Sequence, residues 1–216
     1  MDIQRIILQL AALVLAVIIH EVAHGWVAYR LGDPTAKWMG RLTLNPIPHI
    51  DPVGSVILPV FLALVHAPFL VGWAKPVPIQ VGNLKKLPRD SILVSVAGVA
   101  ANAIGFVAGA LLLKLILLYP DLNSPSLVAV TLHGFAVFLL YFVTINIVLC
   151  LFNLIPVPPL DGGHLLADFL PHNLRISYLK IERFGFVIIL LLLYTGIFDV
   201  LLGAIVTPVL DFILGG

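Results

Sequence analysis

Residues 20–24 read His-Glu-Val-Ala-His. On an α-helix, His20 and His24 lie one turn apart on the same face. Two imidazoles at that spacing can bind one zinc ion. Glu21, about 100° around the helix, lies near enough to accept a proton from a zinc-bound water. The pattern therefore predicts His20 and His24 as metal ligands and Glu21 as a general base.

The setting of this motif makes an accidental match a poor explanation. The motif lies inside an apolar run that extends from about Ile3 to Tyr29. Ionisable side chains inside a membrane span are energetically expensive and usually have a function. The structural alternative is a buried cluster of histidine and glutamate that holds helices together. We favour the metal site, because it explains why the two histidines are one helical turn apart.

A catalytic zinc ion usually takes three protein ligands and one water, so a third ligand is expected elsewhere in the chain. Asp33 follows His24 by nine residues and lies in a polar turn, which makes it a poor candidate. Asp161, in NLIPVPPLDGGHLL, is a better one because it follows an apolar run at prolines that break the helix. Taken alone, its Asp-Gly pair would predict a turn. The histidine pair is what favours Asp161 as the third ligand.

The composition shows what kind of protein must position these groups. Of 216 residues, 61% are hydrophobic and 11% charged, which nearly excludes a soluble globule. The net charge of +1 leaves no basic stripe for nucleic acid. The single cysteine, Cys150, cannot form a disulfide within the chain.

Long apolar runs predict the fold. Four of them are long enough to cross a membrane, and the last is broken near Gly196–Asp199. We expect a single domain over residues 1–216. It should be an all-α polytopic membrane protein with about four to six transmembrane helices and a small membrane-embedded strand or re-entrant region. The four runs are Ile3–Tyr29, Ser91–Leu118, Leu127–Leu154 and Phe184–Leu214.

The distribution of basic residues predicts the topology. Lysines and arginines lie in three loops, at 30–51, 72–90 and 175–183, whereas the loop at 119–126 contains none. Cytoplasmic loops carry the excess of these residues. If the apolar stretch 53–71 crossed the membrane, the first two basic loops would lie on opposite faces. We therefore favour a re-entrant 53–71, which would require a protein-lined cavity.

If the predicted zinc site hydrolyses a peptide bond inside the membrane, a helical substrate must first be unwound, because each peptide group is bonded within the helix. Pairing the unwound substrate with a strand edge would replace the lost hydrogen bonds. Arg41–Leu44 and Trp73–Ile79 are the candidate edges, although Pro76 and Pro78 cannot donate hydrogen bonds.

Taken together, HEVAH in a membrane helix, GWAKPVP in the middle and NLIPVPPLDGG downstream resemble the site-2 protease family of intramembrane metalloproteases. The core motifs span residues 18–166. The resemblance implies one Zn²⁺ per chain, bound by His20, His24 and Asp161, with Glu21 as the catalytic glutamate. It also implies that Asn153 helps to hold the substrate or the oxyanion. The short loop at 119–126 leaves no room for a peptide-binding module, so the chain resembles the compact form of the family.

Other polar residues in the apolar runs have two interpretations. Asn102 and Asn146 could act near the site or form hydrogen bonds between helices. Glycines such as Gly98, Gly105 and Gly109 are expected to permit close helix packing. His49 and Asp51 could lie near the metal or form a local turn.

The expected function is hydrolysis of peptide bonds within or near transmembrane helices, with a membrane-protein substrate and the lipid bilayer as partners. By resemblance, the expected location is a prokaryotic inner membrane, with the site toward the cytoplasm. Two alternatives remain open: a catalytically silent scaffold, which needs no general base, and a metal transporter using the same ligands. The sequence does not indicate a substrate or an oligomeric state.

Overall fold

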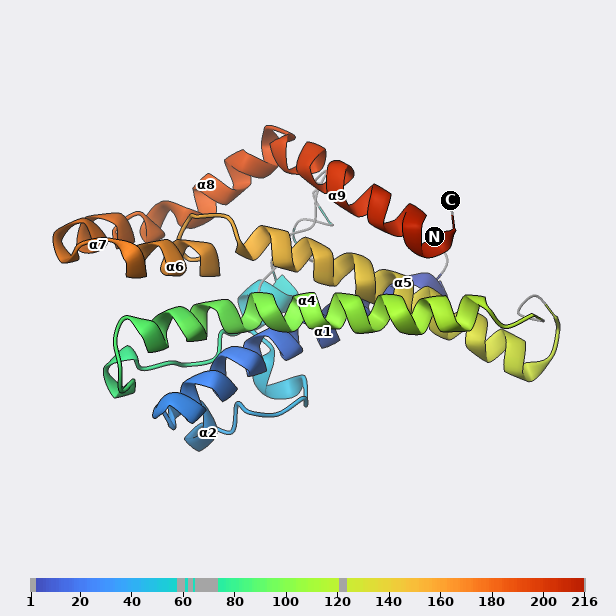
Figure 1. The fold of residues 1–216 in the computed structure, drawn as a ribbon, viewed down its shortest axis with the longest axis horizontal. Helices are drawn as coiled ribbons and strands as arrows, with labels where there is room; N and C mark the ends of the chain where they lie inside the picture. The colour runs from blue at the N-terminus through green and yellow to red at the C-terminus, as the bar shows by residue number, and fades with distance from the viewer. Residues whose placement is uncertain (1–2, 58–60, 62–63, 65–73, 121–123, 216) are drawn as a thin grey trace.

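The computed structural model of this chain describes residues 3–57, 61, 64, 74–120 and 124–215. Three long helices dominate the fold: α1 (Ile3–Leu31), α4 (Arg89–Leu117) and α5 (Leu127–Asn153) (Figure 1). The shorter elements are α2 (Thr35–Trp38), the 3-10 turns η1 (Ile47–His49) and η3 (Val81–Asn83), the π-helical segment η2 (Pro52–Ile57), α6 (Asp161–Phe169), α7 (His172–Leu179), α8 (Glu182–Tyr194) and α9 (Ile197–Leu214).

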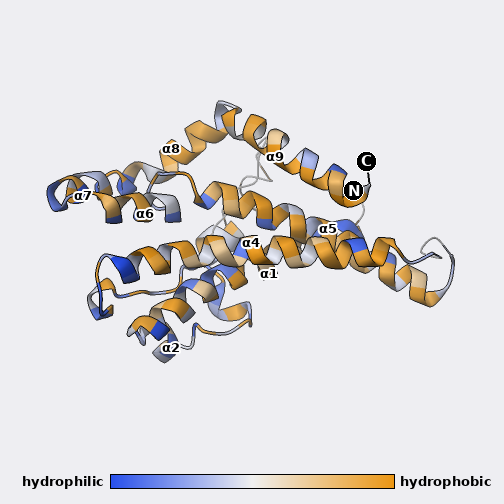
Figure 2. Cartoon of the chain, in the orientation of Figure 1, coloured by the Kyte–Doolittle hydropathy of each residue, from blue (hydrophilic) through white to orange (hydrophobic). Residues whose placement is uncertain are grey.

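Among the described residues, α1, α4 and α5 are the helices long and apolar enough to cross a membrane. At most 33% of the most apolar stretch of each is buried, so their outward faces are apolar too and suit contact with lipid. Figure 2 shows apolar residues along most of α4 and α5 and hydrophilic residues around α2 and α7. A shorter apolar helix covers Val200–Leu214. The predicted all-α fold is confirmed for the described residues, and its three long apolar helices are candidate membrane spans. The total of four to six spans stays a prediction.

Helix α4 packs against both α1 and α5, and α1 also contacts α5. Leu113 of α4 and Leu139 and Val143 of α5 belong to one buried cluster between these helices. A Cβ on Gly109 would lie 3.0 Å from Val143 Cγ2, so the missing side chain lets the two helices approach closely. This confirms the packing role expected for Gly109.

The end of α1 and the start of α4 lie at the same end of the bundle. Ala28 of α1 clusters with Leu84 and with Val94 of α4. The chain between Leu31 and Arg89 therefore returns to the end at which it left, as a re-entrant stretch 53–71 requires. Of that stretch, the structure describes only residues 53–57, 61 and 64.

The expected strand at Arg41–Leu44 is wrong. Residues 42–44 form bends, Arg41 has no regular structure, and no β-strand occurs in the described part of the chain. A strand needs a neighbouring backbone to bond with, whereas Thr43 O accepts a hydrogen bond from the His49 ring instead. At the second candidate edge, the Lys75 N–H donates to His49 O, and Pro76 and Pro78 have no N–H. Trp73 lies outside the described residues.

Helix α6 starts directly against the proline-rich turn that precedes it. A Cβ on Gly162 would lie 2.5 Å from Leu154 O, and one on Gly163 would lie 2.3 Å from Pro158 N. Both glycines are needed for this approach. Asp161 is consequently the first residue of a helix rather than part of an isolated Asp-Gly turn, and it faces α1.

The last apolar stretch is broken where it was predicted to break. Gly196 has φ +70°, a left-handed conformation that favours glycine, and it separates α8 from α9. Figure 1 shows the two helices meeting at an angle there.

Candidate metal centre

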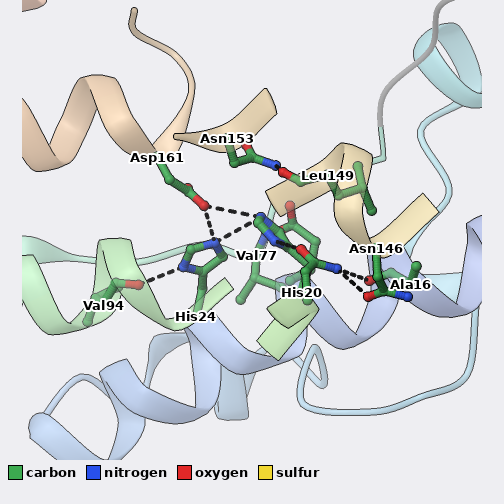
Figure 3. A network of polar contacts seen from close by, with 11 residues as sticks. Ala16, His20, His24, Val77, Val94, Asn146, Leu149, Asn153 and Asp161 are labelled. Atoms are coloured by element: carbon green, nitrogen blue, oxygen red, sulfur yellow. Dashed lines mark hydrogen bonds and ion pairs between the residues drawn. The ribbon is translucent and has the colours of Figure 1, made fainter. Parts of the chain in front are cut away.

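Three side chains from two distant parts of the chain converge at one point. His24 Nε2 lies 3.1 Å from His20 Nε2. Asp161 Oδ2 lies 3.3 Å from His20 Nε2 and 3.2 Å from His24 Nε2. Figure 3 shows Asp161 directed toward the two imidazoles of α1. The fold thus brings the two predicted histidines together with the predicted aspartate.

The Nδ1 atoms of both imidazoles, which face away from Asp161, form hydrogen bonds. His24 Nδ1 lies 2.7 Å from the carbonyl oxygen of Val94, which can only accept, so Nδ1 carries the proton. His20 Nδ1 lies 2.6 Å from Asn102 Oδ1, which likewise accepts. In neutral imidazoles this leaves both Nε2 atoms as lone pairs facing the carboxylate, the arrangement usual for metal-binding histidines.

These three atoms fit a divalent zinc ion. Asp161 Oδ2 is buried and has no hydrogen-bond donor among the described residues. Three lone-pair atoms about 3 Å apart repel one another unless a cation lies between them. Ligands bound at about 2.0–2.1 Å to a tetrahedral zinc ion lie about 3.3 Å apart, which matches the observed separations. Two histidines and a carboxylate also leave the fourth position open, as catalytic zinc sites do.

Gly98 of α4 makes room for this centre. A Cβ at this position would lie 2.2 Å from His24 Nε2 and 2.5 Å from His20 Cε1. The expectation that Gly98 permits close packing is therefore confirmed, and its neighbours are the imidazoles themselves.

Glu21 lies next to His20 in the sequence, and its carboxylate accepts a hydrogen bond from a backbone N–H. Its Oε2 accepts a hydrogen bond of 2.7 Å from the N–H of Val77. Val77 stands between Pro76 and Pro78, so its N–H is the one backbone donor of that triplet. Val77 is itself buried.

Val77 belongs to an extended segment, Lys75–Gln80, that we call the strap. The strap is fixed at both ends. At its start, Arg41 Nη2 donates to Lys75 O, and Lys75 N donates to His49 O. At its end, Gln80 N donates to Asp33 Oδ2 at 2.6 Å. These bonds determine where the Val77 N–H meets Glu21.

Asp33 anchors the strap rather than a metal ion. Its buried carboxylate accepts from Asn83 Nδ2, from Thr35 and from the Gln80 backbone. Burial alone would raise the pKa of Asp33. The hydrogen bonds from Asn83, Thr35 and Gln80 outweigh that effect and hold the pKa below its ordinary value. The sequence argument against Asp33 as a ligand agrees with this position.

A cavity of about 380 Å³ contains the centre. Its lining includes Glu21, Val77, Asn153 and Asp161. Toward the α6–α7 end the lining includes Arg175, whose guanidinium pairs with buried Asp168 at 2.8 Å. Water and a peptide segment could both reach the three ligands through such a space.

Asn153 lies in the cavity wall with its amide fixed. Its Nδ2 donates to Leu149 O, one turn back in α5, at 3.0 Å. An amide nitrogen carries two hydrogens, so one remains to donate into the cavity. Figure 3 shows Asn153 on the same side of the histidines as Asp161.

His49 and Asp51 take the local structural role. The His49 ring is buried and donates through Nε2 to Thr43 O. Asp51 Oδ1 accepts from the backbone N–H groups of Val53 and Gly54 at the start of η2. Neither is part of the three-ligand cluster.

Two roles were not predicted from the sequence, that of the Val77 N–H and that of the Asp33 anchor. A signal for Val77 was present in the Pro-Val-Pro triplet, where a single N–H separates two residues that lack one. No comparable local signal marks Asp33, because its partners Gln80 and Asn83 are about fifty residues away.

Comparison with known proteins gives a consistent picture. The model of Peptidase family M50 matches residues 8–195. The chain is 39% identical over 183 residues to YwhC of Bacillus subtilis, covering 85% of this chain and 78% of that protein. It is 32% identical over 189 residues to Rip2 of Mycolicibacterium smegmatis, covering 88% and 67%. Both relatives are named as candidate zinc metalloproteases.

No solved structure matches this chain. The family match contains both halves of the centre, the histidine pair in α1 and Asp161 at the start of α6. The chain therefore belongs to peptidase family M50, the site-2 protease family of zinc metalloproteases.

Proposed function

We propose that this chain is an intramembrane zinc endopeptidase that cuts membrane-protein substrates within or near their transmembrane helices. The observation that carries the proposal is the convergence of His20, His24 and Asp161 in one cavity with Glu21. His24 lies seven residues before the end of α1, about 10 Å along the helix. In a hydrocarbon core of about 30 Å, the chemistry would take place inside the bilayer.

The proposed ligands are His20 and His24 through Nε2 and Asp161 through Oδ2, holding one Zn²⁺. When bound, zinc lowers the pKa of a coordinated water and polarises the scissile carbonyl. Glu21 takes the proton from the attacking water and later delivers it to the leaving amine nitrogen. Its side chain lines the same cavity as the three proposed ligands.

Asn153 is the proposed donor to the developing oxyanion. Its bond to Leu149 O fixes the plane of the amide and leaves a second N–H, on a residue that lines the same cavity as Asp161. A donor oriented before the reaction stabilises the charge without reorganisation.

The proposed partners are a transmembrane-helix substrate and the lipid bilayer, with no nucleic acid. The proposed location is a prokaryotic inner membrane with the site toward the cytoplasm. The basic loops support this orientation, since the end of α1 and the start of α4 share one end of the bundle with them.

Two other functions use the same residues. A scaffold would need no general base, and here Glu21 is present, oriented and in the cavity wall. A metal transporter would move zinc across vesicles that contain the chain, whereas the protease would not. The family match favours hydrolysis over both.

The decisive experiment is cleavage of a single-span substrate by the purified chain in detergent, comparing the parent with Glu21→Gln. We expect product from the parent and its loss in the variant, with zinc content unchanged. Equal product from both would overturn the proposal. A zinc-flux assay in proteoliposomes made from the same two samples separates the transporter from the protease.

A further inference from the structure

A chain of amide hydrogen bonds runs from His20 through α4 to α5. His20 Nδ1 donates to Asn102 Oδ1 at 2.6 Å. Asn102 Nδ2 donates to Asn146 Oδ1 at 2.8 Å, and Asn146 Nδ2 donates to Phe142 O at 2.7 Å. Both asparagines are fully buried, with 0% of their surface exposed. Burying two amides inside an apolar bundle is costly unless their hydrogen bonds are made.

The direction of this chain is set by two backbone carbonyls. Phe142 O can only accept, so it must face the NH₂ group of Asn146, which turns Asn146 Oδ1 toward α4. Asn102 then presents its own NH₂ to Asn146, and the same group lies 3.4 Å from Ala16 O. Only Asn102 Oδ1 is left to face His20. Reversing either amide would place two acceptors against each other.

We propose that Asn102 and Asn146 form a positioning relay that holds His20 in its metal-binding tautomer. This inference rests on the proposed function only in that His20 binds zinc. Because Asn102 Oδ1 keeps the proton on His20 Nδ1, Nε2 stays a lone pair directed at the metal position. His24 needs no such relay, since it donates directly to the backbone at Val94.

The fold reserves space for the relay. A Cβ on Gly105 would lie 2.9 Å from Asn146 Oδ1, and one on Gly98 would enter the imidazoles. Gly98, Asn102 and Gly105 follow one another at helical spacing on a single face of α4. That face leaves room for the hydrogen bonds that connect His20 of α1 with Asn146 of α5, besides allowing the helices to pack closely.

The test is the zinc affinity of the full chain in detergent, with Zn²⁺ itself as the probe in competition with a chromogenic chelator. The variants are Asn102→Leu, Asn146→Leu and the double substitution. Removing an outer partner of a metal-binding histidine typically weakens metal binding about 10–100-fold. We expect that loss for each single variant. The double variant should bind no more weakly than Asn102→Leu, because the relay acts as one unit.

Thr144→Val is the matched control. Thr144 lies on the same helix and donates to Leu140 O, one turn back, as Asn146 does to Phe142 O. A role confined to joining helices would lower the unfolding temperature of Asn146→Leu and leave its zinc affinity equal to that of the control, and this result would overturn the relay. So would losses that multiply in the double variant. If Asn146→Leu does not fold, Asn146→Ser replaces it, since a serine is too short to reach Asn102.

Zinc binding is measured without substrate, so this test is independent of whether the parent cleaves anything. Cleavage by the parent together with control-like zinc affinity in Asn146→Leu would overturn the relay and leave the protease intact. Weakened zinc binding in the variants, together with no substrate cleavage by the parent, would support the relay and overturn only the proposed activity.

Discussion

The carboxylate of Glu21 accepts a hydrogen bond from the backbone N–H of Val77 at 2.7 Å. A backbone donor cannot rotate away as a side chain can. It orients the carboxylate while leaving the second oxygen, Oε1, available for water. The strap therefore positions the carboxylate proposed as the general base, although no side chain of the strap is a proposed ligand.

Removing this donor should impair catalysis without removing the metal. Val77→Pro deletes the N–H, and we expect cleavage to fall about 10–100-fold, since misplacing a catalytic group by about 1 Å has effects of that size. The measurements are kcat/KM for a single-span substrate and zinc content. Val77→Ala keeps the N–H and is the matched control. Equal losses in the two variants would assign the effect to the buried side chain instead.

Loss of the third ligand should empty the site. In Asp161→Ala only the two histidines remain, and we expect zinc to be removed by a chelator at least 10-fold more readily than from the parent. Metal analysis after dialysis measures this. Asp51→Ala is the control, because Asp51 only caps the start of η2 and should retain zinc like the parent. Full zinc occupancy in Asp161→Ala would remove Asp161 from the ligand set.

A methyl group at Gly98 should disturb the centre directly. It would lie 2.2 Å from His24 Nε2, so Gly98→Ala should lower both zinc occupancy and stability, the latter by about 1–3 kcal/mol from overpacking. Gly134→Ala in α5 is the control, since among the described residues no side chain or neighbouring element lies within 4 Å of the added Cβ. Alanine stabilises a helix by up to about 1 kcal/mol relative to glycine, so the control should be neutral or slightly stabilising. Similar behaviour of the two variants would contradict the close approach at Gly98.

The hydrogen-bonded carboxylate of Asp33 should make the stability of the folded chain depend on pH. The pKa of Asp33 is lowered in the folded chain, so ionised Asp33 stabilises the fold above the ordinary carboxyl range. That stability is lost as pH falls through the lowered pKa, below about pH 4. Asn83 and Gln80 donate to different oxygens of Asp33, so Asp33→Asn sets its NH₂ group against one of these two donors and should cost about 1–3 kcal/mol at neutral pH.

Thermal unfolding in detergent between pH 3 and pH 7 measures this dependence. The parent should lose stability toward acid, and Asp33→Asn should show a smaller change over the same range. Identical pH profiles for the two chains would show that Asp33 is not the group responsible.

The metal site itself was predictable from local patterns. His20, Glu21 and His24 lie within five residues, and the helical repeat alone decides that the two imidazoles share a face. The break near Gly196 and the apolar spans also follow from local composition. Asp161 needed one further premise, that a zinc site lacks a ligand, and the resemblance of NLIPVPPLDGG to a known family supplied the rest.

The prediction of a strand at Arg41–Leu44 was wrong because strand pairing depends on distant parts of the chain rather than on a local pattern. A strand exists only when another backbone lies alongside it, and sequence pattern does not show which backbone that is. In the fold, the His49 ring donates to the Thr43 carbonyl and the Arg41 guanidinium donates to the Lys75 carbonyl, so each bond joins a side chain to a backbone rather than two backbones.

The sequence by itself determined which side chains could bind zinc and in what register on α1, because helix geometry acts over a few residues. Only the tertiary structure decided what holds those side chains. The Val77 N–H meets Glu21 across 56 residues, and Asn102 meets His20 across 82. Such contacts depend on how whole helices and the strap pack, and hydrogen bonds between parts so distant leave no periodic trace in the chain.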